Sequence, residues 1–385
     1  MDQLTAKLQC DPIRILYLID SLSSGGAQRQ LTTLICALDH RIVKPTVAVY
    51  RPFWHFRPEL ERMKVPIILL GNLGARDPRV TLRLARLIWI GRFDLVHSYL
   101  RTPGLLARAM SIVRHDTKII ISQRSTNLDQ SRWRLLLERL LAHRGDAMIT
   151  NAEAIKAYVE QLIPKWRGRI HVVPNGITLT NVSKEICCRA RDFKARFVTT
   201  DDQILIGAVA RLSSEKDPFL LLDGLQRLPD KILSRLRIVW VGSTRNRNLL
   251  IKVTDKIRQL RLSTSFFFAP EMQQIRIVYQ SIDVLVLTSR REGLPNVVLE
   301  AFAEGKPVIA TDVGDVKTLV ENEKNGWLVP PGDPDALAEA FKNMVKAGRI
   351  GRLTMGRLGF DKVRQNYSSE CLARRTLDVY KKILY

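Results

Sequence analysis

The sequence lacks the features of a membrane-spanning or disulfide-bonded protein. No apolar run reaches the ~18 residues that a transmembrane helix needs, and the richest stretch is interrupted by Arg83, Arg86, Arg92 and Asp94. The five cysteines form no CxxC pair, and an odd count makes a poor disulfide framework. Residues 1–10 contain no apolar core of a secretory signal. We therefore expect a chain that works in a reducing cytoplasm.

Acidic residues are scarce relative to basic ones. The chain holds 61 Lys or Arg against 38 Asp or Glu, which gives a net charge of +23. Residues 51–150 alone hold 18 against 8, an excess of 10. Such an excess suits nucleic acid, an anionic membrane face or phosphorylated substrates, or it merely aids solubility. No zinc-ligand spacing, RNP-like aromatic motif or basic tail is present, so we expect no nucleic-acid partner.

Short apolar runs alternate with helical patterns in the first half of the chain. Residues 13–19 form an almost continuous apolar run, which is typical of a strand buried on both faces. The run ends in a polar loop that contains Gly25 and Gly26. Further strands are predicted at 45–50, 66–70, 94–98, 118–122 and 147–150, with helices at 27–38, 81–91, 104–113 and 131–143. This alternation predicts a parallel sheet with helices on both faces.

The alternation pauses at the polar residues 178–203, where we predict a basic helix at 185–197 and a linker near residues 178–200, and then restarts. Strands are predicted at 204–210, 236–241, 264–268, 283–288 and 308–311. At roughly 150 residues per domain, the length suits two domains. We predict an N-terminal domain over residues 1–180 and a C-terminal domain over 181–365. Both would be doubly wound, Rossmann-like α/β domains that face each other across a cleft, with ligands beyond the carboxyl ends of the strands.

The strongest candidate for ligand binding is the segment 288–301, which follows a predicted strand and leads into a predicted helix. The helix dipole and the backbone N–H groups at its start would form an anion seat. Glu292 precedes the helix and Glu300 lies inside it, so the two carboxylates could grip two hydroxyl-bearing parts of one ligand. The alternative is an acidic first turn and one solvated glutamate. The loop residues assigned to the ligand are Gly293, Leu294, Pro295 and Asn296.

A second loop, after the strand predicted at 204–210, carries Arg211 and Lys216. Asp217 and Pro218 follow as the expected N-cap and first residue of a helix. The planar fork of an arginine and the point charge of a lysine could together clamp a diphosphate. Cations beside a helix start are unfavourable unless an anion joins them, so the pattern favours binding over two ordinary surface charges.

These motifs resemble family 4 of the retaining glycosyltransferases, which adopt the GT-B fold. The likeness rests on Arg211-x4-Lys216, Glu292-x7-Glu300, Ser24-Gly25-Gly26-Ala27, Val173-Pro174-Asn175-Gly176-Ile177 and Thr311-Asp312-Val313-Gly314. The resemblance implies that Arg211 and Lys216 hold the donor diphosphate, that Glu292 touches the sugar and that Glu300 touches the ribose. The Gly25-Gly26 loop would face the donor phosphates or the acceptor. The last helix, about 366–385, would pack back on the N-terminal domain.

The sequence departs from the family pattern after the strand predicted at 118–122. Family members often carry a histidine there, whereas this chain has Gln123, which cannot act as an acid or base. The next residue, Arg124, is predicted to contact phosphate or acceptor. His97, at the end of another strand, is either an acceptor-side contact or a hydrogen-bonded structural histidine.

The sequence therefore predicts a glycosyltransferase that moves a sugar from a nucleotide-diphosphate sugar to a saccharide or lipid-linked acceptor with retention. We expect Arg211, Lys216 and Glu292 to be catalytic, and a role in cell-surface polysaccharide or glycolipid synthesis. No Asp-rich motif is present, so we expect neither a metal nor another cofactor. The alternatives are a non-catalytic sugar-nucleotide binder and an epimerase.

The basic N-terminal half raises one further hypothesis. The helices predicted at 81–91 and 131–143 mix Arg with Leu, Ile and Trp. Interfacial helices have this composition, and so do ordinary helices with one buried face. Peripheral docking on an anionic inner face of the cytoplasmic membrane is the functional alternative. The sequence does not identify the nucleotide, the sugar, the acceptor or the oligomeric state.

Overall fold

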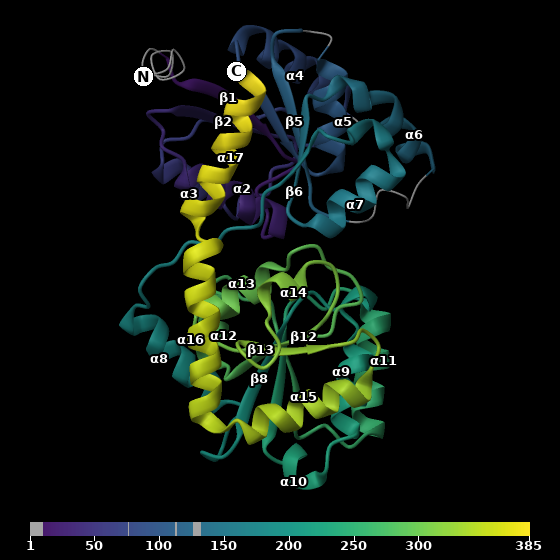
Figure 1. Ribbon diagram of the computed structural model, residues 1–385, viewed down its shortest axis with the longest axis vertical. Coiled ribbons are helices and arrows are strands. Elements are labelled where there is room, and N and C mark those ends of the chain that lie inside the picture. The colour runs from purple at the N-terminus through teal and green to yellow at the C-terminus, as the bar shows by residue number, and fades with distance from the viewer. Residues whose placement is uncertain (1–10, 76, 112–113, 126–131) are drawn as a thin grey trace. The chain divides into compact units, whose positions relative to one another are not determined.

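The computed structural model describes residues 11–75, 77–111, 114–125 and 132–385. The chain forms two compact units (Figure 1). The N-terminal unit comprises Met1–Thr178 and Ser368–Tyr385, and the C-terminal unit comprises Leu179–Tyr367. Each is a Rossmann-like α/β domain built on one parallel sheet, which confirms the predicted fold class.

The N-terminal unit contains a seven-stranded parallel sheet in the order β3-β2-β1-β4-β5-β6-β7. The central strand β1 is buried at five of its six positions, as its apolar run predicts. The strands are β1 (Ile13–Leu18), β2 (Val43–Val49), β3 (Ile67–Leu69), β4 (Leu95–Tyr99), β5 (Lys118–Gln123), β6 (Ala147–Thr150) and β7 (Ile170–Val172).

Helices cover both faces of this sheet. One face carries α2 (Gly26–Ala37), α3 (Arg57–Arg62) and α17 (Ser369–Leu384), whose apolar residues share one core cluster. The other face carries α4 (Pro78–Gly91), α5 (Arg101–Met110), α6 (Arg132–Leu140), a 3-10 turn (Leu141–Arg144), α7 (Glu153–Leu162) and a 3-10 turn (Pro164–Trp166). The return of α17 to the N-terminal unit is the arrangement that the family resemblance implies, and Figure 1 shows it beside α2.

The C-terminal unit contains a six-stranded parallel sheet in the order β10-β9-β8-β11-β12-β13. The first strand, β8, again lies in the middle because its apolar residues are buried on both faces. The strands are β8 (Ile204–Val209), β9 (Leu236–Val241), β10 (Phe266–Ala269), β11 (Val284–Leu287), β12 (Val308–Thr311) and β13 (Gly326–Val329).

Several helices of the C-terminal unit begin at a side chain that caps them. Ser183, Asn246 and Asp333 accept hydrogen bonds from first-turn N–H groups of their helices. The helices are α8 (Lys184–Ala195), a 3-10 turn (Ser214–Lys216), α9 (Pro218–Gln226), α10 (Asp230–Leu233), α11 (Arg247–Gln259), α12 (Arg276–Ser281), α13 (Asn296–Ala303), α14 (Val316–Leu319), α15 (Pro334–Lys346) and α16 (Gly348–Asn366).

The linker predicted near residues 178–200 is for most of its length an integral part of the C-terminal unit. The basic helix predicted at 185–197 is present as α8, and it belongs to the C-terminal unit, within the range 181–365 predicted for that domain. Lys194 Nζ lies 2.7 Å from Asp283 Oδ1, and that carboxylate also accepts the N–H of Leu205 at the start of β8. This ion pair at the amino ends of β8 and β11 anchors the helix, a contact that polar composition alone does not predict.

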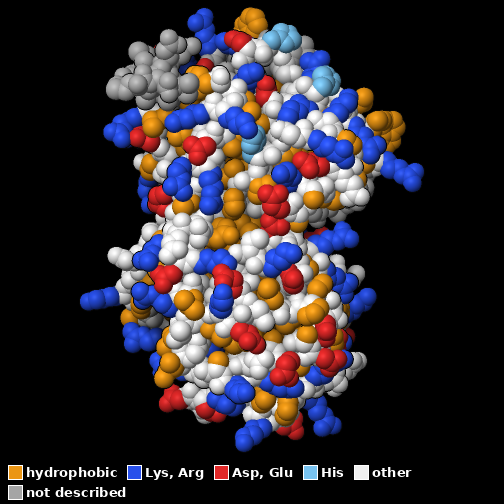
Figure 2. Space-filling model, viewed as in Figure 1, with side chains coloured by type: hydrophobic (Ala, Val, Ile, Leu, Met, Phe, Trp, Pro, Cys, Tyr) orange, Lys and Arg blue, Asp and Glu red, His pale blue; other side chains and the backbone are white. Residues whose placement is uncertain are grey.

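Within the described part of the chain, no helix is both long enough and apolar enough to cross a membrane. Lys and Arg side chains are spread over both units on the face shown in Figure 2, as the net charge of +23 requires.

Candidate functional site: the strand-end loops of the C-terminal unit

Two neighbouring strands of the C-terminal sheet place the predicted donor-binding residues close together. Strands β8 and β11 pair in parallel, so the loops that follow them leave the same edge of the sheet. The loop after β8 contains Arg211 and ends in the 3-10 turn Ser214–Lys216. The loop after β11 contains Glu292 and leads into α13.

Lys216 and Glu292 meet at the centre of this site. The Lys216 ammonium lies 2.5 Å from Glu292 Oε1, and both side chains are largely buried, with 25% and 14% of their areas exposed. The Ser289 hydroxyl donates to the same oxygen at 2.7 Å. Among the described residues, none donates to Glu292 Oε2. One carboxylate oxygen therefore fixes the lysine while the other is available to a ligand hydroxyl.

Hydrogen bonds between the two loops hold Lys216 and Glu292 beside each other. The Arg290 N–H donates to Glu215 O at 2.8 Å, and the Thr288 hydroxyl donates to Lys216 O at 2.9 Å. The Arg290 guanidinium also lies 2.6 Å from Asp217 Oδ2, and this contact raises the pKa of the Arg290 guanidinium. Asp217 caps α9 as predicted, accepting from Leu220 N. Thr288 and Arg290 lie within the predicted binding segment 288–301, but their contacts with the other loop were not predicted.

A third loop, after β12, closes over the Glu292-Gly293 peptide. Gly314 has a φ of +57°, and a Cβ built on it would lie 2.2 Å from the Glu292 carbonyl oxygen. The next residue, Asp315, donates its N–H to Gly293 O at 3.0 Å. Only glycine therefore fits at residue 314 without moving the segment that carries Glu292. The sequence analysis assigned no role to Gly314.

The amino end of α13 follows this segment directly. Pro295, the predicted first residue of the helix, is instead its N-cap, and α13 begins one position later at Asn296. Leu294 is buried, so the loop is anchored in the core while Gly293 and Asn296 are partly exposed. The helix dipole makes this end of α13 favourable for a negative charge.

Glu300 lies one turn further along α13. Its side chain is 9% exposed, and Oε2 accepts a hydrogen bond from the hydroxyl of Tyr279 on α12 at 2.5 Å. Tyr279 was not predicted, because its approach depends on the packing of α12 near α13. The contact fixes the carboxylate that the family resemblance assigns to the ribose.

Arg211 differs from Lys216 because its side chain is exposed. Among the described residues, its guanidinium makes no hydrogen bond or ion pair. An exposed arginine on the same loop as Lys216 can rotate onto an anion without breaking an existing contact.

The predicted site residues of the N-terminal unit lie at or near the carboxyl ends of its strands, with Gly25 and Gly26 after β1, His97 within β4 and Arg124 after β5. Gly25 is the N-cap of α2 and Gly26 is its first residue. As a glycine, Gly25 has no side chain with which to cap the helix. A Cβ on Gly25 would lie 2.2 Å from Gln28 Oε1, and Gln28 donates its amide to Asp20 at 2.9 Å. Gly25 thus allows Gln28 to fold back over the loop.

The structure does not place His97 where an acceptor could reach it. Its ring is 0% exposed. Nδ1 lies 2.6 Å from the Tyr380 hydroxyl and Nε2 lies 2.9 Å from the Ser122 hydroxyl. Burial, with a smaller contribution from the positive charge of Arg124, lowers the pKa of His97 well below its usual value. His97 is therefore the structural histidine of the two alternatives.

Gln123 is the last residue of β5, and Arg124 follows it in the loop where the sequence departs from the family pattern. The Arg124 guanidinium donates to Asn175 Oδ1 and lies 5.0 Å from the centre of the Tyr99 ring. Gln123 is buried and donates to Ser125 O at 2.6 Å. Thr126 and Asn127, which come later in the same loop, lie outside the described residues.

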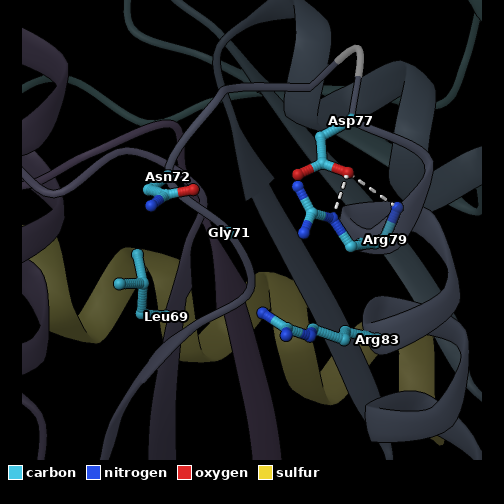
Figure 3. A pocket seen from close by; sticks show the side chains of 6 residues that line it. All are labelled: Leu69, Gly71, Asn72, Asp77, Arg79 and Arg83. Atoms are coloured by element: carbon cyan, nitrogen blue, oxygen red, sulfur yellow. Dashed lines mark hydrogen bonds and ion pairs between the residues drawn. The ribbon is translucent and has the colours of Figure 1, made fainter.

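The described surface also contains a hollow of about 220 Å³ in the N-terminal unit, near the start of α4 (Figure 3). Asp77 in this hollow is paired with Arg79 at 3.0 Å, and Arg83 donates to Leu70 O. Its cations are thus engaged by protein groups, in contrast to Arg211. Among the described residues no group of three or more His, Cys, Asp or Glu side chains could hold a metal ion.

Two family models match the chain, one for each unit. Residues 24–181 match "Glycosyltransferase Family 4", and residues 190–354 match "Glycosyl transferases group 1". The second match contains every residue of the site described above in the C-terminal unit.

Curated relatives match over most of the chain at low identity. The lipopolysaccharide core biosynthesis glycosyltransferase LpsE of Rhizobium meliloti is 25% identical over 94% of this chain and 96% of its own length. A second relative, from Campylobacter jejuni, is 25% identical over 86% of this chain and 88% of its own length. Its name is GalNAc-alpha-(1->4)-GalNAc-alpha-(1->3)-diNAcBac-PP-undecaprenol alpha-1,4-N-acetyl-D-galactosaminyltransferase.

Solved structures match the whole fold. Anabaena HepE in complex with UDP-glucose superposes with a TM-score of 0.82 at 20% identity, over 96% of this chain and 100% of that one. Sucrose-phosphate synthase from Thermosynechococcus elongatus superposes with a TM-score of 0.78 at 18% identity, over 96% and 99%. These superpositions show a shared two-domain architecture.

Proposed function

The chain belongs to the GT-B glycosyltransferases that join a family 4 domain to a group 1 domain, and from this premise we propose that it transfers a hexosyl or N-acetylhexosaminyl group with retention to a saccharide or lipid-linked acceptor. The donor is a nucleoside-diphosphate sugar bound by the C-terminal unit. The bond between the anomeric carbon and the diphosphate oxygen breaks, and a bond to the acceptor oxygen forms as that hydroxyl loses its proton.

The observation that carries this proposal is the meeting of Lys216 and Glu292 beside the amino end of α13. A diphosphate needs cations, and a sugar needs a hydrogen-bond acceptor for its hydroxyls. Lys216 supplies a cation for the diphosphate, and Glu292 Oε2 supplies a hydrogen-bond acceptor for a sugar hydroxyl. The two side chains are in direct contact, with the Lys216 ammonium 2.5 Å from Glu292 Oε1. Exposed Arg211 adds a second cation on the same loop.

The main barrier to transfer is the separation of charge, because the sugar becomes cation-like while the diphosphate departs with added negative charge. Preorganised donors at the leaving group are worth about 3–4 kcal/mol each in comparable sites. In the proposed reaction, Arg211, Lys216 and the dipole of α13 stabilise that charge. We propose that these groups take the place of a divalent metal, so that the chain needs no cofactor.

A lipid-linked acceptor and peripheral membrane association belong to the same proposal. One relative acts on an undecaprenol-linked saccharide and another in lipopolysaccharide core synthesis, by their names. A lipid-linked substrate would hold the enzyme at an anionic leaflet, and a net charge of +23 suits that surface. The proposed location is therefore the inner face of a cytoplasmic membrane, in polysaccharide or glycolipid synthesis.

The test is a screen of nucleoside-diphosphate sugars by thermal shift, followed by an assay of donor consumption with a membrane extract as the source of acceptor. We expect one donor to raise the Tm of the protein and to be consumed only when acceptor is present. The rate of donor consumption should be the same with and without a metal chelator. Retention is read from the anomeric proton coupling of the product. Conversion of the donor without acceptor would identify an epimerase, and donor binding without turnover would identify a non-catalytic binder.

A further inference from the structure

Helix α6 presents its apolar stripe to solvent instead of to the core. Trp133, Leu136, Leu137 and Leu140 recur at the spacing of one helix face, which in an ordinary surface helix is the buried face. Here their exposed fractions are 77%, 46%, 45% and 56%. Helix α4, on the same side of the sheet, shows the ordinary arrangement, since its Val80, Leu84 and Ile88 are all buried.

A buried ion pair fixes α6 in this rotation. Glu138, the only acidic residue between Arg132 and Arg144, points inward and pairs with Arg108 of α5. The two side chains are 5% and 1% exposed. Arg108 is held in turn by the Gly104 carbonyl at 3.1 Å, and Arg101 lies 3.4 Å from the other Glu138 oxygen. A carboxylate so enclosed by two guanidinium groups cannot turn outward without leaving both cations unpaired.

Cations flank the stripe on both sides. At about 100° per residue, Arg134 lies to one side of the apolar stripe and Arg132 and Arg139 lie to the other. All three are exposed. Figure 2 shows apolar side chains with Lys and Arg beside them at the edge of the N-terminal unit where Figure 1 places α6. This arrangement suits a lipid surface. When an apolar stripe enters the bilayer, the long cationic side chains beside it reach back to the lipid headgroups.

We propose that this α6 face, defined by Trp133, Leu136, Leu137 and Leu140 with Arg132, Arg134 and Arg139, inserts into the interface of an anionic bilayer. The inference deepens the membrane association of the proposed function and rests on it. Charge decides between occupants: a second copy of the chain in a two-fold contact would bring its own arginines against these three, whereas anionic headgroups neutralise them. The stripe then enters the acyl boundary while Glu138 keeps the helix oriented.

The first experiment is co-sedimentation with vesicles of equimolar phosphatidylglycerol and phosphatidylcholine, compared with pure phosphatidylcholine. We expect the wild-type chain to bind the anionic vesicles, and the double variant W133S/L137S to bind them at least about tenfold more weakly. The matched control is I251S/L353S, which removes two apolar side chains of 58% and 59% exposure from the C-terminal unit and should bind as the wild type does. Equal loss in the control, or no loss in W133S/L137S, would overturn the proposal.

A second measurement reports insertion directly. Brominated phosphatidylglycerol quenches the fluorescence of tryptophans that enter the bilayer. W133F keeps the apolar area but removes the indole, so it should sediment as the wild type does and lose most of the quenching. Unchanged quenching in W133F would contradict insertion of α6. A concentration-dependent dimer that W133S/L137S abolishes would instead identify a second copy as the occupant and overturn the proposal.

These results are separable from the test of the proposed function. Donor binding and donor consumption with a water-soluble acceptor fragment depend on the C-terminal site, so W133S/L137S should retain both within about twofold. A wild-type chain that binds vesicles but no donor would refute the proposed transfer reaction. A chain that binds donor but no vesicles would refute only the α6 surface.

Discussion

The Lys216 ammonium and the Glu292 carboxylate lie 2.5 Å apart although 76 residues separate them in the chain. Each side chain is held by the other, and Ser289 donates to the same carboxylate oxygen. The pair thus acts as one unit in which the carboxylate orients the cation, and the first prediction tests that dependence.

We expect K216Q and E292Q each to lower kcat by about 10²–10³-fold, because one removes a cation from the leaving group and the other releases it from its position. The double variant should lose far less than the product of the two single losses. The measurement is release of nucleoside diphosphate at saturating donor. K342Q, on the exposed face of α15, is the control and should keep its full rate. Additive losses would show that the two residues act separately.

Gly314 should be required for the position of Glu292. Gly314 and Gly332 have φ values of +57° and +76°, so alanine is strained at either residue. Only at residue 314 would the new Cβ also collide with backbone, at 2.2 Å from Glu292 O, whereas nothing lies within 4 Å of it at residue 332. We expect G314A to lower the free energy of unfolding by about 1–3 kcal/mol more than G332A does, and G314A alone to lose transfer activity. Urea unfolding and the transfer assay measure the two effects, and equal behaviour of the variants would contradict this role.

His97 should affect stability and its pH dependence, not acceptor binding. Burial lowers the pKa of His97, so below about pH 6.5 the unfolded chain binds a proton that the folded chain does not. The free energy of unfolding should therefore fall as the pH drops below 6.5, by up to about 1.4 kcal/mol per pH unit from this residue.

The H97Q variant lacks this contribution. Because the carboxylates and His171 are the same in wild type and H97Q, the difference between the two proteins isolates the effect of His97. We expect the difference in unfolding free energy between wild type and H97Q to shrink between pH 7.5 and 5.5. The KM for acceptor should stay unchanged, because the ring contacts Tyr380 and Ser122 inside the unit. A constant difference across this range, or a raised KM, would contradict the structural role.

Arg108 should be far more important for stability than an exposed arginine. R108M leaves the Glu138 carboxylate buried without its main partner, which costs about 3–5 kcal/mol in comparable sites. R41M removes an ion pair whose arginine is 91% exposed, and it should change stability by less than about 1 kcal/mol. Urea unfolding of the two variants measures the contrast. A similar small loss in both would mean that the buried pair does not fix α6.

Sequence reasoning reached the donor site because its determinants are local. A buried strand ends, a loop with fixed residue types follows, and a helix begins, so β8 and β11 could be located and their loops brought to one sheet edge. It could not place His97, because the residue that covers it, Tyr380, is 283 positions away and arrives on α17. It also could not decide the rotation of α6. The spacing of Trp133, Leu136 and Leu137 predicts a buried face, and only the capture of Glu138 by Arg108 turns that face outward.

Calorimetric titration with nucleoside diphosphates tests most directly whether the C-terminal unit grips a diphosphate through Arg211 and Lys216. One of them should bind, and at a hundredfold excess over its Kd it should raise the free energy of unfolding by about 2.7 kcal/mol. The matching nucleoside without phosphates should bind at least about a hundredfold more weakly, and so should R211Q/K216Q with the diphosphate. Equal affinity of wild type and R211Q/K216Q for the diphosphate, or equal affinity of the wild type for nucleoside and diphosphate, would contradict a diphosphate site at Arg211 and Lys216.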